Sequence, residues 1–250
     1  MKDNIEVGYD FRLDTKCGDP DTDSLKLYNF HSLLWNQKVA NNKTLNLQVL
    51  NKNYGRLILK TNLTDNLSSD RMFPHFIGKY NGKLDSWLSD SDKEKLQYKV
   101  RTIGGHIVFP AHRKNGFTIN QARGVNRKIS DRFDLTLECI KRFYQNEESP
   151  LSSTLCRYSE FFRVFENFEN YIEFFMLQDF IKCNGEINYA LPFDDFNRSA
   201  LPKSKKEYGD YMNITVELID KRNKRIFKRI KNIVCLLYTS PSPRDGLLTR

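Results

Sequence analysis

The sequence predicts an α+β fold, a predominantly helical single domain that carries a small antiparallel sheet. Apolar residues recur at three-and-four spacing over long segments, most clearly from Ile119 to Tyr144, as they do in amphipathic helices. Residues 44–50 instead alternate apolar and polar side chains, which is typical of a half-buried strand. Helical periodicity covers far more of the chain than strand periodicity, so the sheet is expected to be small.

The composition indicates a folded chain with a basic surface. The 250 residues include 18 Phe and 12 Tyr, which excludes an intrinsically disordered chain. Forty Lys and Arg stand against 31 Asp and Glu, a formal net charge of +9. This charge favours nucleic acid, phosphates or acidic proteins as partners, although a solvated basic surface is also an ordinary way to keep a protein soluble.

Targeting, membrane and metal signals are all missing from the sequence. The N-terminus has no apolar segment of a secretory signal, and the richest apolar run, 171–181, is interrupted by Glu173, Gln178 and Asp179. No cofactor motif is present, and the cysteines lack the CxxC spacing of a zinc site. Scattered thiols fit a reducing compartment. We therefore expect a cytoplasmic protein without membrane contact, bound metal or cofactor. The cysteines in question are Cys17, Cys139, Cys156 and Cys183.

Acidic residues are concentrated between Tyr9 and Ser24. The spacing of Asp19, Asp21 and Asp23 is that of a calcium loop, but Pro20 interrupts it and the required glycine and bidentate glutamate are missing. We interpret the segment as a turn that ends in the N-cap of a helix.

The next elements are expected to be a helix and a hairpin. Leu25 to Trp35 has helical spacing, and His31 on its apolar stripe is interpreted as a core residue. Residues 44–50 and 57–61 are the expected paired strands. Residues 62–74 are expected to form a loop, in which Ser68, Ser69 and Asp70 are turn residues and not a nucleophilic site.

A glycine pair separates the next predicted helix from a strand. Ser91 and Glu94 match a capping box, so a helix is expected to run to about Arg101. Gly104 and Gly105 end it, and His106–Pro110 is a short strand. The glycines serve either a tight strand entry or the approach of a ligand phosphate to the backbone. His106 and His112 are candidate acid or base groups, because the pKa of histidine lies near neutrality.

The segment from Ile119 to Tyr144 is expected to be one helix, bent at Gly124. Its first half is basic, with Arg123, Arg127, Lys128 and Arg132, and Asp131, Asp134 and Glu138 then form a carboxylate stripe. Basic residues at a helix N-terminus oppose the helix dipole, so we expect them to pair with carboxylates elsewhere in the fold or to bind an acidic ligand. The carboxylate stripe alone does not predict a metal.

The second half of the chain is expected to be helical and rich in core aromatics. Ser149 and Pro150 begin a helix, and its apolar stripe continues after a break near Asn167. A final helix is expected from Tyr208 to Ile233. Between Lys221 and Lys231 it carries seven basic residues, which form either a solvated face or a track for a phosphate backbone.

These features leave several functions open. The first is a binding module for an acidic partner or nucleic acid, acting through the 221–231 face and four candidate binding residues: Arg12, Arg123, Asn126 and Arg127. The alternative is a hydrolase or transferase acting on a phosphate-containing substrate. In that enzyme, Asp10, His106 and Asp131 are the candidate catalytic residues, and they converge on one pocket with the same four binding residues. The third hypothesis is a structural domain whose charged side chains pair with each other.

Several segments together resemble a known family. They occur in this order: YDFRLDT, LSSDRMFP, RTIGGHIVFP, TINQARGVNRKISDRFDLTLECIKRFY, SPLSSTLCRYSEFF, FFMLQDF and LPFDDF. The chain resembles, over residues 9–230, the bacterial family called domain of unknown function 6994. The resemblance implies a single-domain cytoplasmic bacterial protein, and it implies no activity.

The C-terminal segment has a different origin. Residues 235–245, CLLYTSPSPRD, resemble the in-frame translation of a transposase-type sequencing adaptor. We therefore expect residues 1–234 to form one globular domain and residues 235–250 to be a non-native, disordered tail.

Overall fold

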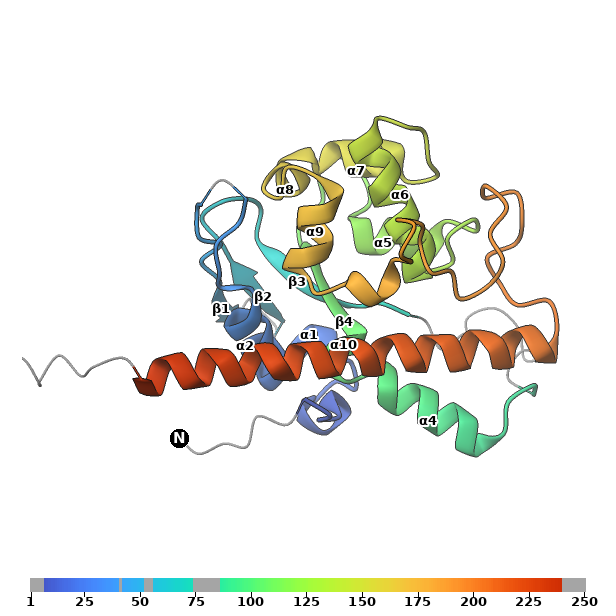
Figure 1. Cartoon of the computed structure of the whole chain (residues 1–250), viewed down its shortest axis with the longest axis horizontal. Coiled ribbons are helices and arrows are strands. Elements are labelled where there is room, and N and C mark those ends of the chain that lie inside the picture. Colours follow the sequence, from blue (N-terminus) through green and yellow to red (C-terminus); the bar gives the residue numbers. More distant parts are fainter. Residues whose placement is uncertain (1–6, 41, 52–55, 74–85, 240–250) are drawn as a thin grey trace, which may run out of the picture.

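The computed structural model describes residues 7–40, 42–51, 56–73 and 86–239, and it confirms a predominantly helical α+β domain with a small antiparallel sheet (Figure 1). The first half contains α1 (Pro20–Asp23), α2 (Leu25–Trp35), β1 (Gln48–Asn51), β2 (Leu57–Lys60), β3 (Leu67–Arg71), α4 (Asp90–Val100) and β4 (His106–Pro110). The second half contains α5 (Ile119–Val125), α6 (Phe133–Gln145), α7 (Ser152–Arg157), α8 (Ser159–Arg163), α9 (Phe168–Phe174) and α10 (Lys205–Thr239). Short 3-10 turns are η1 (Phe11–Asp14), η3 (Ile103–Gly105) and η4 (Gln178–Phe180).

The sheet has the strand order β1-β2-β3-β4, and each pair of neighbouring strands is antiparallel. The expected hairpin strands are present as β1 and β2, and β4 is the strand expected after the two glycines. The loop expected at 62–74 was wrong, because residues 67–71 form β3 between β2 and β4. Ser68, Ser69 and Asp70 are buried there and pair with Phe109, Val108 and Ile107. Polar side chains are stable in a central strand because other elements satisfy them.

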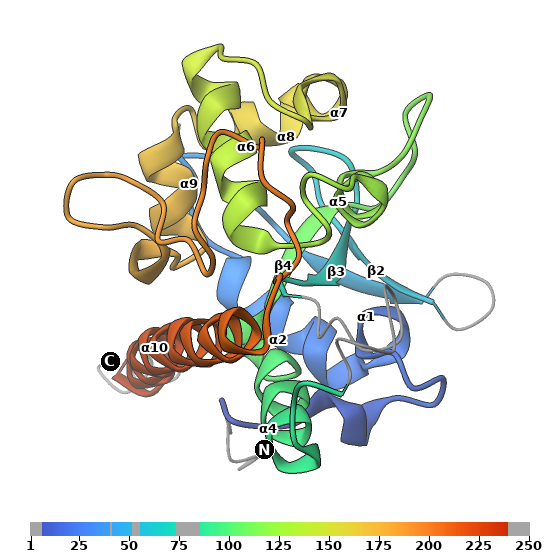
Figure 2. The same ribbon diagram turned by 90° about the vertical axis from the view of Figure 1, so that its right-hand side faces the viewer.

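The sheet separates two groups of helices. Helices α5 to α9 lie on one side, and α1, α2 and α4 lie on the other (Figure 2). Helix α10 runs along the whole molecule and packs against α4, η3 and η4 (Figure 1). Arg222 ties this helix to the sheet, because its fully buried guanidinium donates to the carbonyl oxygens of Gly104 at 3.0 Å and His106 at 2.6 Å, and to that of Phe175 at 3.0 Å.

The single helix expected from Ile119 to Tyr144 was wrong. Helix α5 ends at Val125, and α6 begins at Phe133. In the turn between them, Ser130 and Asp131 have left-handed backbones, with φ of 47° and 64°. The Asp131 amide donates to the carbonyl oxygen of Arg123, so the turn folds back on α5. The apolar periodicity continues through the turn because both helices bury the same side of the chain.

Other boundaries also differ from expectation. Helix α4 is capped by Ser89, whose hydroxyl accepts from the Asp92 amide at 3.1 Å, and not by Ser91. Helix α10 begins at Lys205 and continues to Thr239, into the segment expected to be a tail; residues 240–250 lie outside the described residues. Within the described residues, no helix has the length and apolar character needed to cross a membrane.

Candidate active site

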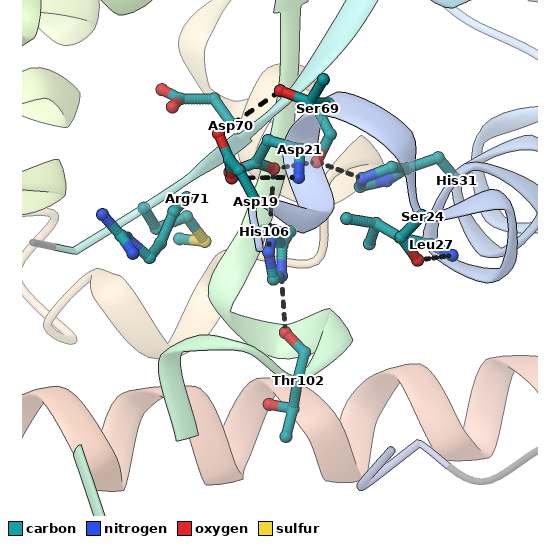
Figure 3. Close-up of polar contacts among 12 residues, drawn as sticks. Asp19, Asp21, Ser24, Leu27, His31, Ser69, Asp70, Arg71, Thr102 and His106 are labelled. Carbon is teal, nitrogen blue, oxygen red and sulfur yellow. Dashed lines mark hydrogen bonds and ion pairs between the residues drawn. The ribbon is translucent and has the colours of Figure 1, made fainter. Parts of the chain in front are cut away.

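A polar cluster lies between β3, the start of β4 and the short helix α1 (Figure 3). Side chains alternate along a strand, so Ser69 and Arg71 point to one face of the sheet and Asp70 to the other. Arg71 is the direct cross-strand partner of His106, so these two side chains share a face. The Ser69 hydroxyl contacts Asp21 of α1, which places this face on the α1 side.

A directed chain of hydrogen bonds fixes the Asp21 carboxylate. The indole nitrogen of Trp35 donates to Nδ1 of His31 at 3.1 Å, so a neutral His31 carries its proton on Nε2. Nε2 then donates to Oγ of Ser69 at 3.0 Å, and Ser69 donates to Oδ1 of Asp21 at 2.6 Å. Because indole can only donate, neutral His31 cannot accept a proton from Ser69, which excludes a serine–histidine nucleophile here.

His106 faces the same carboxylate without a hydrogen bond to it. Its Nδ1 donates to the carbonyl oxygen of Thr102 at 2.9 Å, so Nε2 of the neutral ring carries a lone pair. Nε2 lies 3.7 Å from Oδ1 of Asp21, is buried, and has no hydrogen-bond partner in the described part of the chain. Burial lowers the pKa of His106, and the charges of Arg101 and Arg71 act in the same direction, although Asp21 opposes them. The ring is therefore held neutral and able to accept a proton.

Two arginines give this cluster its positive charge. Arg71 and Arg101 are half-buried, and neither has a carboxylate partner among the residues described. Nη1 of Arg101 is buried and has no hydrogen-bond partner in the part of the chain that the structure describes. Burial lowers the pKa of Arg101 to about 10, and the neighbouring charge of Arg71 contributes, while Asp21 and Asp19 oppose the change. Two guanidinium groups without a carboxylate partner in the described ranges are suited to bind an anion.

Arg123 lies on the opposite face of β3 and forms an internal ion pair. It is fully buried, pairs through Nη1 with Asp70, and donates to the carbonyl oxygens of Met72 at 2.7 Å and Asp131 at 2.8 Å. Burial raises the pKa of Asp70, and Arg123 opposes that rise. The Arg123 guanidinium is therefore paired inside the fold. Of the two explanations offered for the basic residues of this segment, a carboxylate elsewhere in the fold applies to Arg123.

The other candidate residues are spread over the fold. Arg12 pairs with Asp10 and Glu94, both at 2.6 Å, and this pair adjoins the site because the Phe11 amide donates to the carbonyl oxygen of Arg101. The amide of Asn126 donates to the carbonyl oxygen of Pro150, and Arg127 is exposed. The structure thus brings His106 into the cluster with Asp10 and Arg12 beside it, while Asn126 and Arg127 lie in the turn region after α5.

The expected carboxylate stripe is divided between separate ion pairs. Asp134 pairs with Arg132, and Glu138 pairs with Arg142 at 2.8 Å. Asp131 lies in the turn before α6. No group of three or more His, Cys, Asp or Glu side chains suited to a metal ion occurs among the described residues. Asp134 and Glu138 therefore neutralise neighbouring arginines.

Four residues of the cluster were not predicted as site residues from the sequence: Asp21, Ser69, Arg71 and Arg101. Asp21 and Ser69 were both interpreted as turn residues, and Arg101 as a helix end. The available signal was the run Ser68 to Arg71, four polar residues bounded by Leu67 and Met72. A polar run between apolar residues is compatible with a loop as well as a strand. Only the contacts in the fold show that this run is a strand.

Comparisons with known proteins identify the family of the chain, and that family has no described activity. A search of curated proteins gave no match, and a search of solved structures gave none either. The family model described as "Family of unknown function (DUF6994)" matches residues 5–226, which contain every residue of the polar cluster. The chain therefore belongs to this family, DUF6994.

Proposed function

We propose that the protein is a hydrolase or transferase acting on a phosphate-containing substrate, with its active site at Asp21, His106, Arg71 and Arg101. The observation that carries the proposal is the position of the His106 Nε2 atom. It is buried, without a partner among the described residues, and 3.7 Å from the Asp21 carboxylate. The ring donates from Nδ1 to the carbonyl oxygen of Thr102 and presents the lone pair of Nε2, as a general base does, and Asp21 lies close enough to stabilise the protonated ring.

Each group has a defined role in the proposed reaction. Arg71 and Arg101 bind the phosphate oxygens and stabilise negative charge as the transferring group passes through its transition state. Nε2 of His106 takes the proton from the attacking hydroxyl, which belongs to water in a hydrolase or to an acceptor alcohol in a transferase. The attacking oxygen forms a bond to phosphorus as the bond to the leaving oxygen breaks on the opposite side. The leaving oxygen takes a proton from solvent, and His106 then releases its proton to solvent. Asp21 stabilises the intermediate imidazolium.

The proposal is tested by substitution at His106. The purified chain is assayed against a panel of phosphate monoesters, diesters and nucleotides, and binding of inorganic phosphate is measured by calorimetry. His106→Asn is expected to lower kcat by about 100-fold or more, the usual contribution of a general base. Arg71→Gln is expected to raise KM. The matched control is His112→Asn, because His112 is half-buried and its Nε2 lies 3.5 Å from the Asn66 amide.

Two outcomes contradict this assignment. One is a turnover by His106→Asn equal to that of the native chain. The other is an absence of both turnover and phosphate binding in the native chain. Circular dichroism of each variant separates a chemical effect from loss of folding.

A second function, binding of nucleic acid or an acidic protein, is favoured by one observation on α10. Of its basic residues, Arg222 is buried, Lys221 pairs with Glu217, and Arg225 pairs with Asp179. Lys224 and Lys228 are exposed and have no carboxylate partner within the described chain. The test is a gel shift at several salt concentrations. The double variant K224Q/K228Q is expected to reduce the salt slope by about two, roughly one for each lost phosphate contact.

A further inference from the structure

A separate cavity shares no lining residue with the polar cluster. Its volume is about 370 Å³, within the range of about 300–1,000 Å³ common for small-ligand sites. Three parts of the chain form its walls: the connection after α2, the α8–α9 region with the residues after it, and the C-terminal half of α10. The segment FFMLQDF contributes three of the lining residues, Phe174, Met176 and Gln178.

The rim of this cavity is cationic. Arg225 is held in a bidentate pair by Asp179, with both contacts at 3.0 Å. Arg229 donates to the side-chain oxygen of Gln37, a neutral amide, so this contact leaves its charge uncompensated. Lys38 is exposed and has no carboxylate partner in the described ranges, and Glu173 is the acidic residue in the lining. Counting Asp179, the rim keeps an excess of positive charge.

The interior of the cavity combines apolar side chains with amides. Val39, Phe165, Phe174 and Met176 provide apolar surface, and the two phenylalanine rings lie 5.0 Å apart. The amides are those of Gln37, Asn170 and Gln178. Oε1 of Gln178 is buried and has no donor among the described residues, an arrangement that costs free energy unless a donor approaches. Such a lining suits a ligand with an apolar body and a polar edge.

We propose that this cavity binds a small organic anion, whose phosphate or carboxylate group pairs with Arg229 and Lys38 and whose body lies against Val39 and Phe174. A guanidinium group presents two parallel donors that fit either anion. The apolar wall distinguishes such a ligand from an inorganic ion. The site shares no residue with the proposed active site, so it is a second ligand site of the protein.

Four probes separate the parts of this proposal. Phenylphosphonate and benzoate share a ring and differ in the anion, and neither contains a phosphate ester that the proposed enzyme would cleave. Inorganic phosphate lacks the apolar body, and benzamide lacks the charge. Binding of each probe to the full chain is measured by titration calorimetry or NMR. Phenylphosphonate, benzoate or both are expected to bind at least tenfold more tightly than inorganic phosphate and benzamide, and the better of the two identifies the anion.

Variants then place the probe in this cavity. Arg229→Gln and Lys38→Glu are each expected to weaken binding at least tenfold. The matched control is Lys224→Gln, which removes one charge from an exposed residue of the same helix outside the cavity lining and is expected to leave binding unchanged. The part of the binding that the cavity variants remove is expected to persist in His106→Asn and Arg71→Gln, so failure of the proposed active site leaves this result intact. Equal binding of benzamide and benzoate, undiminished binding in both cavity variants, or no binding of either anion overturns the proposal.

Discussion

Arg123 and Asp70 form a buried ion pair that joins α5 to the centre of the sheet. The guanidinium also donates to Oγ1 of Thr136 at 2.9 Å and to three backbone carbonyl oxygens, so its donors are used inside the fold. One side chain therefore holds together β3, helix α5, the turn before α6 and the first turn of α6.

Removal of Arg123 is expected to destabilise the fold strongly. Arg123→Met leaves the Asp70 carboxylate buried without its partner, which costs about 3–5 kcal/mol of unfolding free energy. The double variant Arg123→Met with Asp70→Leu removes both charges and is expected to recover much of that loss. Urea unfolding monitored by circular dichroism measures both.

The control for this experiment is Arg127→Gln. Arg127 is exposed in the turn after α5, so its loss is expected to change the unfolding free energy by no more than about 0.5 kcal/mol. If Arg123→Met were as stable as Arg127→Gln, the ion pair would have no structural role.

The Arg123–Asp70 pair also shows which parts of the fold local sequence patterns can predict and which they cannot. Local patterns predicted α2, β2 and β4, because their periodicity or their flanking turns are contained within a few residues. They could not predict β3, because its polar side chains are satisfied by Asp21 and Arg123, which lie 48 and 53 residues away along the chain. The same distance hid most of the candidate site, of which only His106 was identified from sequence.

The turn between α5 and α6 was also not predicted from local sequence patterns. Apolar spacing continues from Ile119 to Tyr144 because both helices face one core, whereas the break depends on left-handed residues that are not glycine. Ser130 and Asp131 are the residues concerned. The turn itself, residues 126–132, contains no glycine or proline, and the bend expected at Gly124 lies one residue before the end of α5.

Gly104 is expected to be intolerant of any side chain. A Cβ atom there would lie 2.6 Å from Oδ1 of Asn223 and 2.7 Å from the carbonyl oxygen of Ile219, both on α10. Gly104→Ala must therefore push α10 away from η3, and overpacking of this kind costs about 1–3 kcal/mol. Thermal unfolding measures the loss.

A glycine on α10 itself provides the comparison. Apart from its chain neighbours and the backbone of its own helix, no heavy atom of the described residues lies within 4 Å of a Cβ added at Gly209, so Gly209→Ala is expected to stabilise the helix by about 0.5–1 kcal/mol. Opposite signs for the two glycine-to-alanine changes are the expected result. A loss of stability in both variants would contradict the steric explanation.

Two buried histidines are expected to make the fold sensitive to acid. Burial lowers the pKa of His31 well below the ordinary value of 6.5, and it also lowers that of His106. Below pH 6.5 the unfolded chain therefore takes up protons that the native chain does not, so stability falls as the pH decreases; above pH 6.5 neither histidine contributes a slope. Each histidine contributes at most about 1.4 kcal/mol per pH unit in this window.

Urea unfolding between pH 7.5 and 5.5 tests this expectation, because most exposed carboxylates remain ionised there. In the native chain the two histidines are expected to add a decrease in unfolding free energy below about pH 6.5, against the opposite contribution of Asp70, whose pKa burial raises. His31→Gln loses a hydrogen bond to Ser69 and so starts from a lower stability, but its decrease with pH is expected to be shallower because one titrating group is gone. An unchanged slope in His31→Gln would show that His31 is protonated in the native chain, which would also remove the basis for the directed hydrogen bonds that fix Asp21.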